Sequence, residues 1–193
     1  MKLTSEQIVQ NWERLLNVIE TEFTGERKDK LLSMYKDLEE RMCMAPASSF
    51  SHYHNCMPGG YVDHVLRVIE CAQEVYELWT RMGADMSGYT KEELIFVALN
   101  HDIGKMGFPG EGNEIYQPND SEWHRKNLGK EYKVNPNNPF TLVNDLSIWL
   151  LQHYGIEITW NEMLGIKLTD GLYDESNKPY YISRTADSKL KTN

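Results

Sequence analysis

Apolar residues recur every three or four positions along most of the chain, which places them on one face of an α-helix. Thr4 and Gln7 form a capping box that predicts the start of a first helix. The same spacing predicts a second helix over 27–42 and a third over 61–81. The buried side of the third helix is expected to comprise Val65, Val68, Ile69, Ala72, Val75, Tyr76 and Trp79.

The second half of the chain continues this pattern. A capping box at Thr90 predicts a short apolar helix that runs into His101, and Gly104 and Gly107 are expected to end it. A fifth helix is expected over 142–154, and a sixth begins at the capping box of Thr159 and runs to about residue 170. The tail over 171–193 is polar and weakly patterned.

The segment 106–140 is rich in Gly, Pro and Asn and is too long for a plain connector. No alternating pattern supports a sheet. The sequence therefore predicts an all-α fold, a compact bundle of at least six helices with one long inserted loop. The expected organisation is a single domain over 1–193, with an N-terminal helical pair (1–44), a metal-site core (52–170) and a lid-like loop (106–140).

Composition narrows the class of protein. The formal charge is −9, so a non-specific nucleic-acid binder is not expected, whereas a small phosphorylated substrate is compatible with it. No apolar run approaches the roughly 20 residues that cross a bilayer, and the N-terminus does not resemble a secretory signal. We therefore expect a cytoplasmic protein without membrane contact, and a homo-oligomer remains open. The three cysteines include no C-x-x-C pair, which predicts reduced, mostly buried thiols.

Candidate chemistry centres on histidines. His101 and Asp102 follow a buried apolar helix, and burying an imidazole beside a carboxylate is costly unless a partner such as a divalent cation satisfies both. His64 lies in the apolar start of the third helix. His64 is either a hydrogen-bonded core residue or a metal ligand that faces the same point as His101 and Asp102. Two histidines and one carboxylate would leave coordination positions open for water, as a catalytic metal requires.

These residues carry a resemblance to a known family. The segment Pro58-Gly59-Gly60-Tyr61-Val62-Asp63-His64, preceded by His52-Tyr53-His54, resembles the N-terminal motif of HD-domain metal-dependent phosphohydrolases. The segment Ala98-Leu99-Asn100-His101-Asp102-Ile103-Gly104-Lys105 resembles their L-x-H-D-I-G-K signature, and the two motif histidines lie 37 positions apart (101 minus 64). The resemblance spans about 53–170, and the long acidic N-terminal helices are similar to those of short HD proteins from tailed phages.

The resemblance implies a helical core, one or two divalent metal ions (Mn, Fe, Zn, Co, Ni or Mg) and hydrolysis of a phosphoester or phosphoanhydride. By position, His64, His101 and Asp102 match metal ligands, and Lys105 matches a lysine that meets the substrate phosphate. The family normally adds a late aspartate. The candidates are Asp170, which we prefer because it ends an apolar helix, Asp187, or a residue beyond 193.

Several assignments remain open between two interpretations. His54 either contacts a phosphate or protonates a leaving group, or it is a plain loop histidine. His153 is either a ligand of a second metal or a polar residue at a helix end. Lys105 could instead be a solvated lysine that stabilises a helix C-terminus. The loop over 106–140 is either a nucleotide lid or a mobile surface loop. As a lid it would contact the substrate through Trp123, Arg125 and Lys126.

The expected function is hydrolysis of a nucleotide-like phosphate by a metal-activated water, with Lys105, His54 and Asp102 in catalysis. Substrate binding is expected from His54, Lys105, Trp123, Arg125 and Lys126. Two alternatives remain. The chain could be a non-catalytic nucleotide- or metal-binding regulatory module on the same scaffold, or a structural helical protein whose histidines are core residues.

Overall fold

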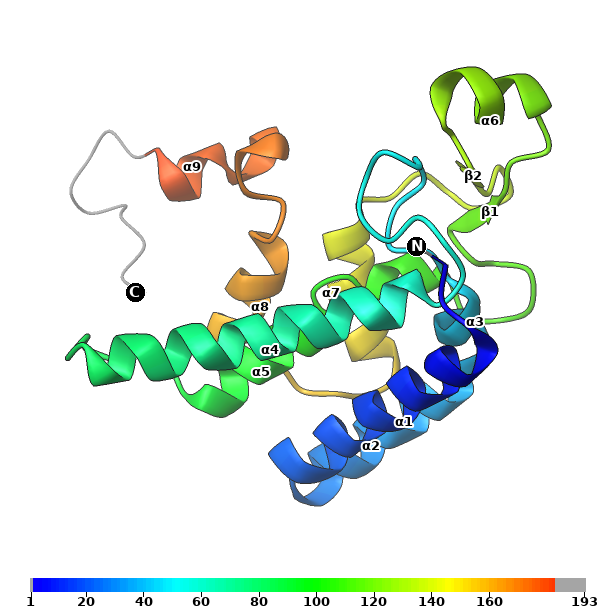
Figure 1. The fold of residues 1–193 in the computed structure, drawn as a ribbon. Coiled ribbons are helices and arrows are strands. Elements are labelled where there is room, and N and C mark those ends of the chain that lie inside the picture. Colours follow the sequence, from blue (N-terminus) through cyan, green and yellow to red (C-terminus); the bar gives the residue numbers. More distant parts are fainter. Residues whose placement is uncertain (1, 183–193) are drawn as a thin grey trace.

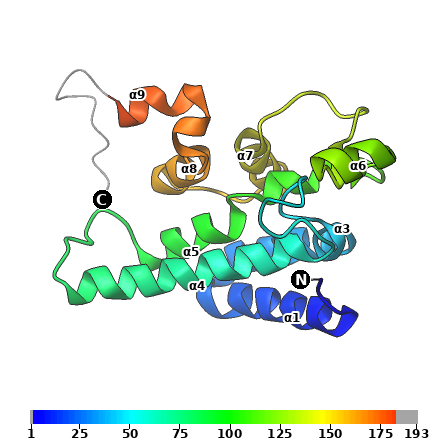
Figure 2. The same ribbon diagram turned by 45° about the horizontal axis from the view of Figure 1, so that its top comes forward.

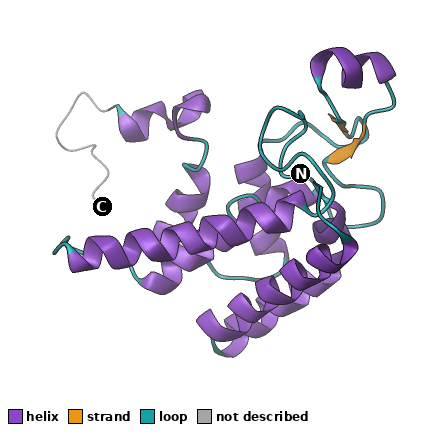
Figure 3. Ribbon diagram, in the orientation of Figure 1, coloured by secondary structure: helices purple, strands orange, loops and turns teal. Residues whose placement is uncertain are grey.

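The structure is a computed structural model that describes residues 2–182 of the 193-residue chain. These residues form nine α-helices, three short 3-10 helices and one two-stranded sheet (Figures 1 and 3). The α-helices are α1 (Ser5–Glu22), α2 (Gly25–Asp37), α3 (Glu39–Met44), α4 (Gly60–Arg81), α5 (Lys91–Asn100), α6 (Glu122–Leu128), α7 (Val143–His153), α8 (Trp160–Lys167) and α9 (Lys178–Tyr181). The remaining elements are the 3-10 helices η1 (Ile103–Met106), η2 (Gly171–Tyr173) and η3 (Glu175–Asn177) and the strands β1 (Tyr116–Pro118) and β2 (Tyr132–Val134). The all-α bundle expected from the sequence is confirmed.

Local capping signals set the starts of three helices. In α1, α5 and α8 the side chains of the N-cap residues Thr4, Thr90 and Thr159 accept a hydrogen bond from the backbone amide three positions on. The Gln or Glu side chain at that position accepts one from the backbone amide of the cap residue. Each box satisfies two helix-terminal amides that have no partner within the helix. The three capping boxes predicted from the sequence are therefore confirmed.

The long helix α4 is the centre of the packing. Helices α1, α3 and α5 pack against it, α2 packs on α1, and α8 packs on both α5 and α7 (Figures 1 and 2). Helix α7 also lies against η1, the short turn that follows α5. Helices α4 and α5, which position His64 and His101, thus pack against each other and also against further helices.

Buried side chains from distant segments join these helices. The hydroxyl of Tyr35 in α2 donates to the Leu99 carbonyl of α5 at 2.9 Å, and both residues are fully buried. The guanidinium of Arg27 lies 4.0 Å from the ring centroid of Phe96 and pairs with the buried carboxylate of Glu162 at 2.6 Å. Helices α2, α5 and α8 therefore share one continuous interior.

Some sequence-based expectations about helices and cysteines are wrong. The helix expected over 27–42 breaks at Leu38, because α2 packs on α1 while α3 turns to pack on α4. Val75 and Trp79 are 39% and 43% exposed, since the ten-residue α5 covers only part of the 22-residue α4. The thiols are unpaired but not mostly buried: Cys71 is exposed on the outer face of α4, and the other two are half-buried.

The inserted segment 106–140 contains a small sheet that the sequence did not predict. Strands β1 and β2 pair antiparallel, with Gln117 opposite Lys133. Each strand has three residues, too few to show an alternating pattern. The buried side chains of Asn119 and Asn135 donate to backbone carbonyls on the facing part of the segment and hold it together. The segment is thus an ordered hairpin with α6 at its tip (Figure 1).

No helix in the described range 2–182 is long and apolar enough to span a membrane.

Candidate metal centre

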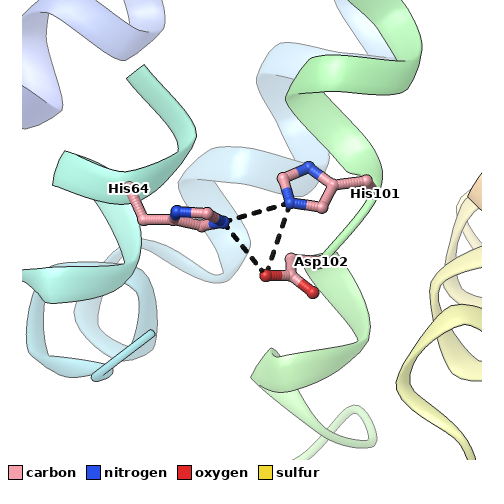
Figure 4. A group of neighbouring side chains, drawn as sticks. All are labelled: His64, His101 and Asp102. Atoms are coloured by element: carbon pink, nitrogen blue, oxygen red, sulfur yellow. Dashed lines mark hydrogen bonds and ion pairs between the residues drawn. The ribbon is translucent and has the colours of Figure 1, made fainter. Parts of the chain in front are cut away.

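Three side chains, one from α4 and two from the turn that follows α5, meet at one point (Figure 4). His64 is in the second turn of α4, His101 caps the C-terminus of α5, and Asp102 follows it. The two Nε2 atoms lie 3.2 Å apart, and Oδ2 of Asp102 lies 3.4 Å from each. Among the described residues, this is the one group of three histidine, cysteine or acidic side chains close enough to share a metal ion.

The three distances suit a common cation. Two ligand atoms bound about 2.1 Å from one ion lie about 3.0 Å apart at a right angle and about 3.4 Å apart at the tetrahedral angle. The observed separations of 3.2, 3.4 and 3.4 Å fall in that interval. Two imidazole nitrogens and a carboxylate oxygen are also ligands that first-row divalent metals accept. The group could therefore hold a metal ion without rearrangement.

The C-terminal turn of α5 orients His101. Its Nδ1 lies 2.9 Å from the carbonyl oxygen of Ala98, which can only accept, so Nδ1 carries the proton. The lone pair of the ring is then on Nε2, the atom that faces His64 and Asp102. A backbone acceptor behind a metal-binding histidine fixes the ring orientation and the tautomer in this way.

The turn after Asp102 is held by close packing against α7. Gly104 lies inside η1, so it does not end a helix as the sequence suggested; Gly107, with φ +78°, ends η1. The Gly104 amide donates to the hydroxyl of Ser147, which in turn donates to the His101 carbonyl at 3.2 Å or to the Val143 carbonyl at 2.9 Å. Glycine is needed here because a Cβ at this position would overlap the backbone of α7 at Val143 and Ser147.

A second support comes from α3. The guanidinium of Arg41 donates to the carbonyl oxygens of Met106 and Phe108 at 3.0 and 2.7 Å, and also to that of Gly110. Met106 is the last residue of η1, and Phe108 and Gly110 follow it. Arg41 therefore satisfies carbonyl oxygens that have no hydrogen-bond partner within a helix. Neither Arg41 nor Ser147 was identified from the sequence, because no local pattern marks a contact between segments so far apart.

Lys105 already contacts the carboxylate. Its ammonium lies 2.5 Å from Oδ2 of Asp102, the oxygen that faces both imidazoles. Burial alone would raise the pKa of Asp102, but the neighbouring His101 and His64 and the charge of Lys105 lower it well below its usual value. Asp102 is therefore ionised at neutral pH and attracts a cation.

The group opens into a pocket of about 470 Å³. His54, Lys105, Thr169 and Asp170 line it together with the three possible ligands. The ring of His54 lies 4.6 Å from that of His64, centroid to centroid. Partial burial and the nearby His64 and Lys105 lower the pKa of His54, which favours its neutral form.

Asp170 faces the pocket but stands apart from the three donor atoms. It lines the pocket, yet its carboxylate is not among the atoms that lie within 4.8 Å of one another. Burial and the charge of Asp102 raise the pKa of Asp170. The other candidate for a late ligand, Asp187, lies outside the described residues.

The other residues suggested by the sequence lie elsewhere. Trp123 is 61% exposed on α6, Arg125 donates to the Asn119 carbonyl, and Lys126 pairs with Glu122. The imidazole of His153 stacks on Trp149 at a centroid distance of 5.0 Å. None of these residues lines the pocket of the candidate centre.

Comparison of the chain with models of protein families, with curated proteins and with solved structures finds no match.

Proposed function

We propose that this protein is a metal-dependent phosphohydrolase of the HD type that cleaves a nucleotide-like phosphate. The observation that carries the proposal is the triangle of His64 Nε2, His101 Nε2 and Asp102 Oδ2, with sides of 3.2 to 3.4 Å, at the floor of an open pocket. The resemblance of the sequence around these residues to the HD motifs supports the same activity.

The three ligands use only part of a coordination sphere. Three protein ligands leave at least one position open, which is the arrangement of catalytic rather than structural metal sites. A divalent cation bound there would lower the pKa of water and neutralise phosphate charge. His101 contributes a fixed lone pair, because the Ala98 carbonyl holds the proton of the ring on Nδ1. Asp102 contributes the negative charge that attracts the cation.

Lys105 and His54 are the side chains that we propose to act on the substrate. Phosphoryl transfer depends mainly on positioning and charge stabilisation, and a lysine serves as a point charge for a phosphate oxygen. Lys105 lines the pocket beside Asp102, and His54 lines it beside His64. As a neutral imidazole, His54 can donate a hydrogen bond to a phosphate oxygen from one ring nitrogen.

Metal analysis combined with a phosphate-release assay tests the proposal. The purified protein is expected to bind one or two equivalents of a divalent metal and to release phosphate from at least one member of a panel of nucleoside mono- and triphosphates. His101→Ala should lose both properties. His153→Ala is the matched control, because it removes an exposed imidazole that does not line the pocket, and it should keep both.

Two results separate the alternatives. Tight nucleotide binding without phosphate release, in metal-loaded protein, would replace the enzyme with a regulatory module. A second result would reject the metal centre: if the metal content is the same in the unchanged protein, His64→Ala and His101→Ala, the two histidines are core residues and not ligands. Loss of metal in His153→Ala would instead assign a second metal to α7.

A further inference from the structure

An apolar groove lies beside the candidate metal centre. Its volume is about 400 Å³, and its walls come from the last turns of α4, the start of α5, helix α8 and α9. Ala72, Leu94 and Val97 line both this groove and the pocket of His64, His101 and Asp102. The two hollows therefore adjoin along these three side chains, and one elongated small molecule could occupy both.

The described lining of the groove is aromatic. Among the residues 2–182, four rings line it, those of Tyr76, Trp79, Tyr89 and Tyr181. The one charged residue in this described lining is Glu93, whose carboxylate accepts hydrogen bonds from Thr90, Thr159 and Asn161. A ligand group bound here is thus neutral and largely apolar, whereas the neighbouring pocket is lined by charged side chains, among them Asp102 and Lys105.

We propose that the groove binds a planar aromatic group of the substrate, as in a nucleobase, while the phosphate of the same molecule lies at the His64–His101–Asp102 end. This inference rests on the phosphohydrolase function proposed above and adds where the substrate is recognised. Aromatic side chains bind flat rings through stacked or edge-to-face contacts. A flexible alkyl chain would lose more conformational freedom on binding than a rigid ring does.

The inference moves substrate recognition away from the inserted segment 106–140. Trp123 on α6 lines neither the groove nor the pocket, whereas Trp79 of α4 lines the groove and is 43% exposed. The spacing of Trp79 in the sequence predicts a core residue, and the structure instead leaves it partly exposed. Its exposure gives it a face that a ligand can reach.

Calorimetric titration with three phosphonates tests the inference, because their P–C bonds resist hydrolysis. Naphthylmethylphosphonate carries a flat ring, octylphosphonate a flexible chain, and methylphosphonate neither. In metal-loaded protein, the naphthyl compound is expected to bind tightest. Trp79→Ala should raise its Kd about tenfold, the usual loss for one stacking ring, and leave the Kd of methylphosphonate unchanged.

Two tryptophans serve as matched controls. Trp160→Ala and Trp123→Ala remove rings that are 67% and 61% exposed and that do not line the groove. Both variants should bind the naphthyl compound as the unchanged protein does. Equal affinity in Trp79→Ala, tighter binding of octylphosphonate than of the naphthyl compound, or a loss confined to Trp123→Ala would each overturn the inference.

A further pair of measurements separates this inference from the proposed function. Naphthalenemethanol has no phosphate, so its binding in chelator-treated protein reports on the groove alone. If it binds and Trp79→Ala weakens it, the groove binds aromatic groups even if no phosphate release is found. If phosphate release occurs but Trp79→Ala raises the KM of no nucleotide, the phosphohydrolase stands and the aromatic subsite is rejected.

Discussion

Replacing Gly104 with alanine tests how closely the metal-binding turn is packed against α7. A Cβ at this position would lie 2.9 Å from the Ser147 amide nitrogen and 3.0 Å from the Val143 carbonyl carbon, and closer still to the Val143 carbonyl oxygen. Carbon atoms in ordinary contact lie about 3.5 to 4.0 Å apart. The obstructing atoms belong to the backbone of a helix, so no side-chain rotation can relieve the overlap.

The structure sets the size and the site of the effect. Separating η1 from α7 by about 0.5 Å or more is an overpacking defect, which costs about 1 to 3 kcal/mol. The same movement weakens the bond from the Gly104 amide to Ser147, worth about 1 kcal/mol. We therefore expect Gly104→Ala to lower the free energy of unfolding by about 3 kcal/mol. It should also weaken metal binding, because His101 and Asp102 precede the displaced turn.

Urea unfolding followed by circular dichroism measures this loss, and two other glycines calibrate it. Gly88→Ala adds a Cβ with no atom within 4 Å, and it should change stability by less than about 0.5 kcal/mol. Gly165→Ala adds a Cβ 2.7 Å from a methyl group of Val97, a side chain that can rotate, and an intermediate loss is expected. Near-equal unfolding midpoints for Gly104→Ala and Gly88→Ala would refute the packing argument.

Three further predictions follow from the same contacts. Tyr35→Phe leaves the Leu99 carbonyl without its buried donor, so urea unfolding should show a loss of about 1 to 2 kcal/mol. Lys105→Gln removes a cation from the oxygen of Asp102 that faces both imidazoles, so calorimetry should show metal affinity rising severalfold while the Kd of methylphosphonate rises about tenfold. Burial raises the pKa of Glu162, despite hydrogen bonds from Thr159 and Arg27, so its folded form holds its proton more tightly than its unfolded form. The free energy of unfolding should therefore fall, relative to that of Glu162→Gln, as the pH rises from about 4.5, the ordinary value, towards neutrality.

Each of these predictions has an opposing result. Unchanged stability in Tyr35→Phe would mean that the Leu99 carbonyl finds another donor. Weaker metal binding in Lys105→Gln would show that the lysine supports the carboxylate rather than competing for it. A stability difference between Glu162→Gln and the unchanged protein that is constant from pH 4.5 to pH 7 would show that burial does not perturb this carboxyl group.

The features that the sequence predicted well depend on neighbours in the chain. The capping boxes at Thr4, Thr90 and Thr159 need only residues three positions apart, and all three are present. The sequence alone does not determine whether His64 lies near His101 and Asp102. Periodicity shows which face of a helix is apolar, but it does not show which helices pack together. The pairing of α4 with α5 brings the three together.

The features that the sequence missed depend on contacts between distant segments. Trp79 has the spacing of a core residue, but it is 43% exposed, because the shorter α5 covers only part of α4. The strands β1 and β2 are too short to show an alternating pattern. The close approach of Gly104 to α7 gives no local signal, because a glycine after a helix is more often read as the residue that ends it.

The contacts of Tyr35 and Arg41 bear on how far the chain can be shortened. Both residues belong to the N-terminal 44, yet one secures the carbonyl of Leu99 and the other the carbonyls that follow η1. Side chains from the first three helices thus hold the backbone on both sides of the turn that contains His101 and Asp102. A shorter version that begins after Met44 would keep every candidate ligand and lose the scaffold that aims two of them.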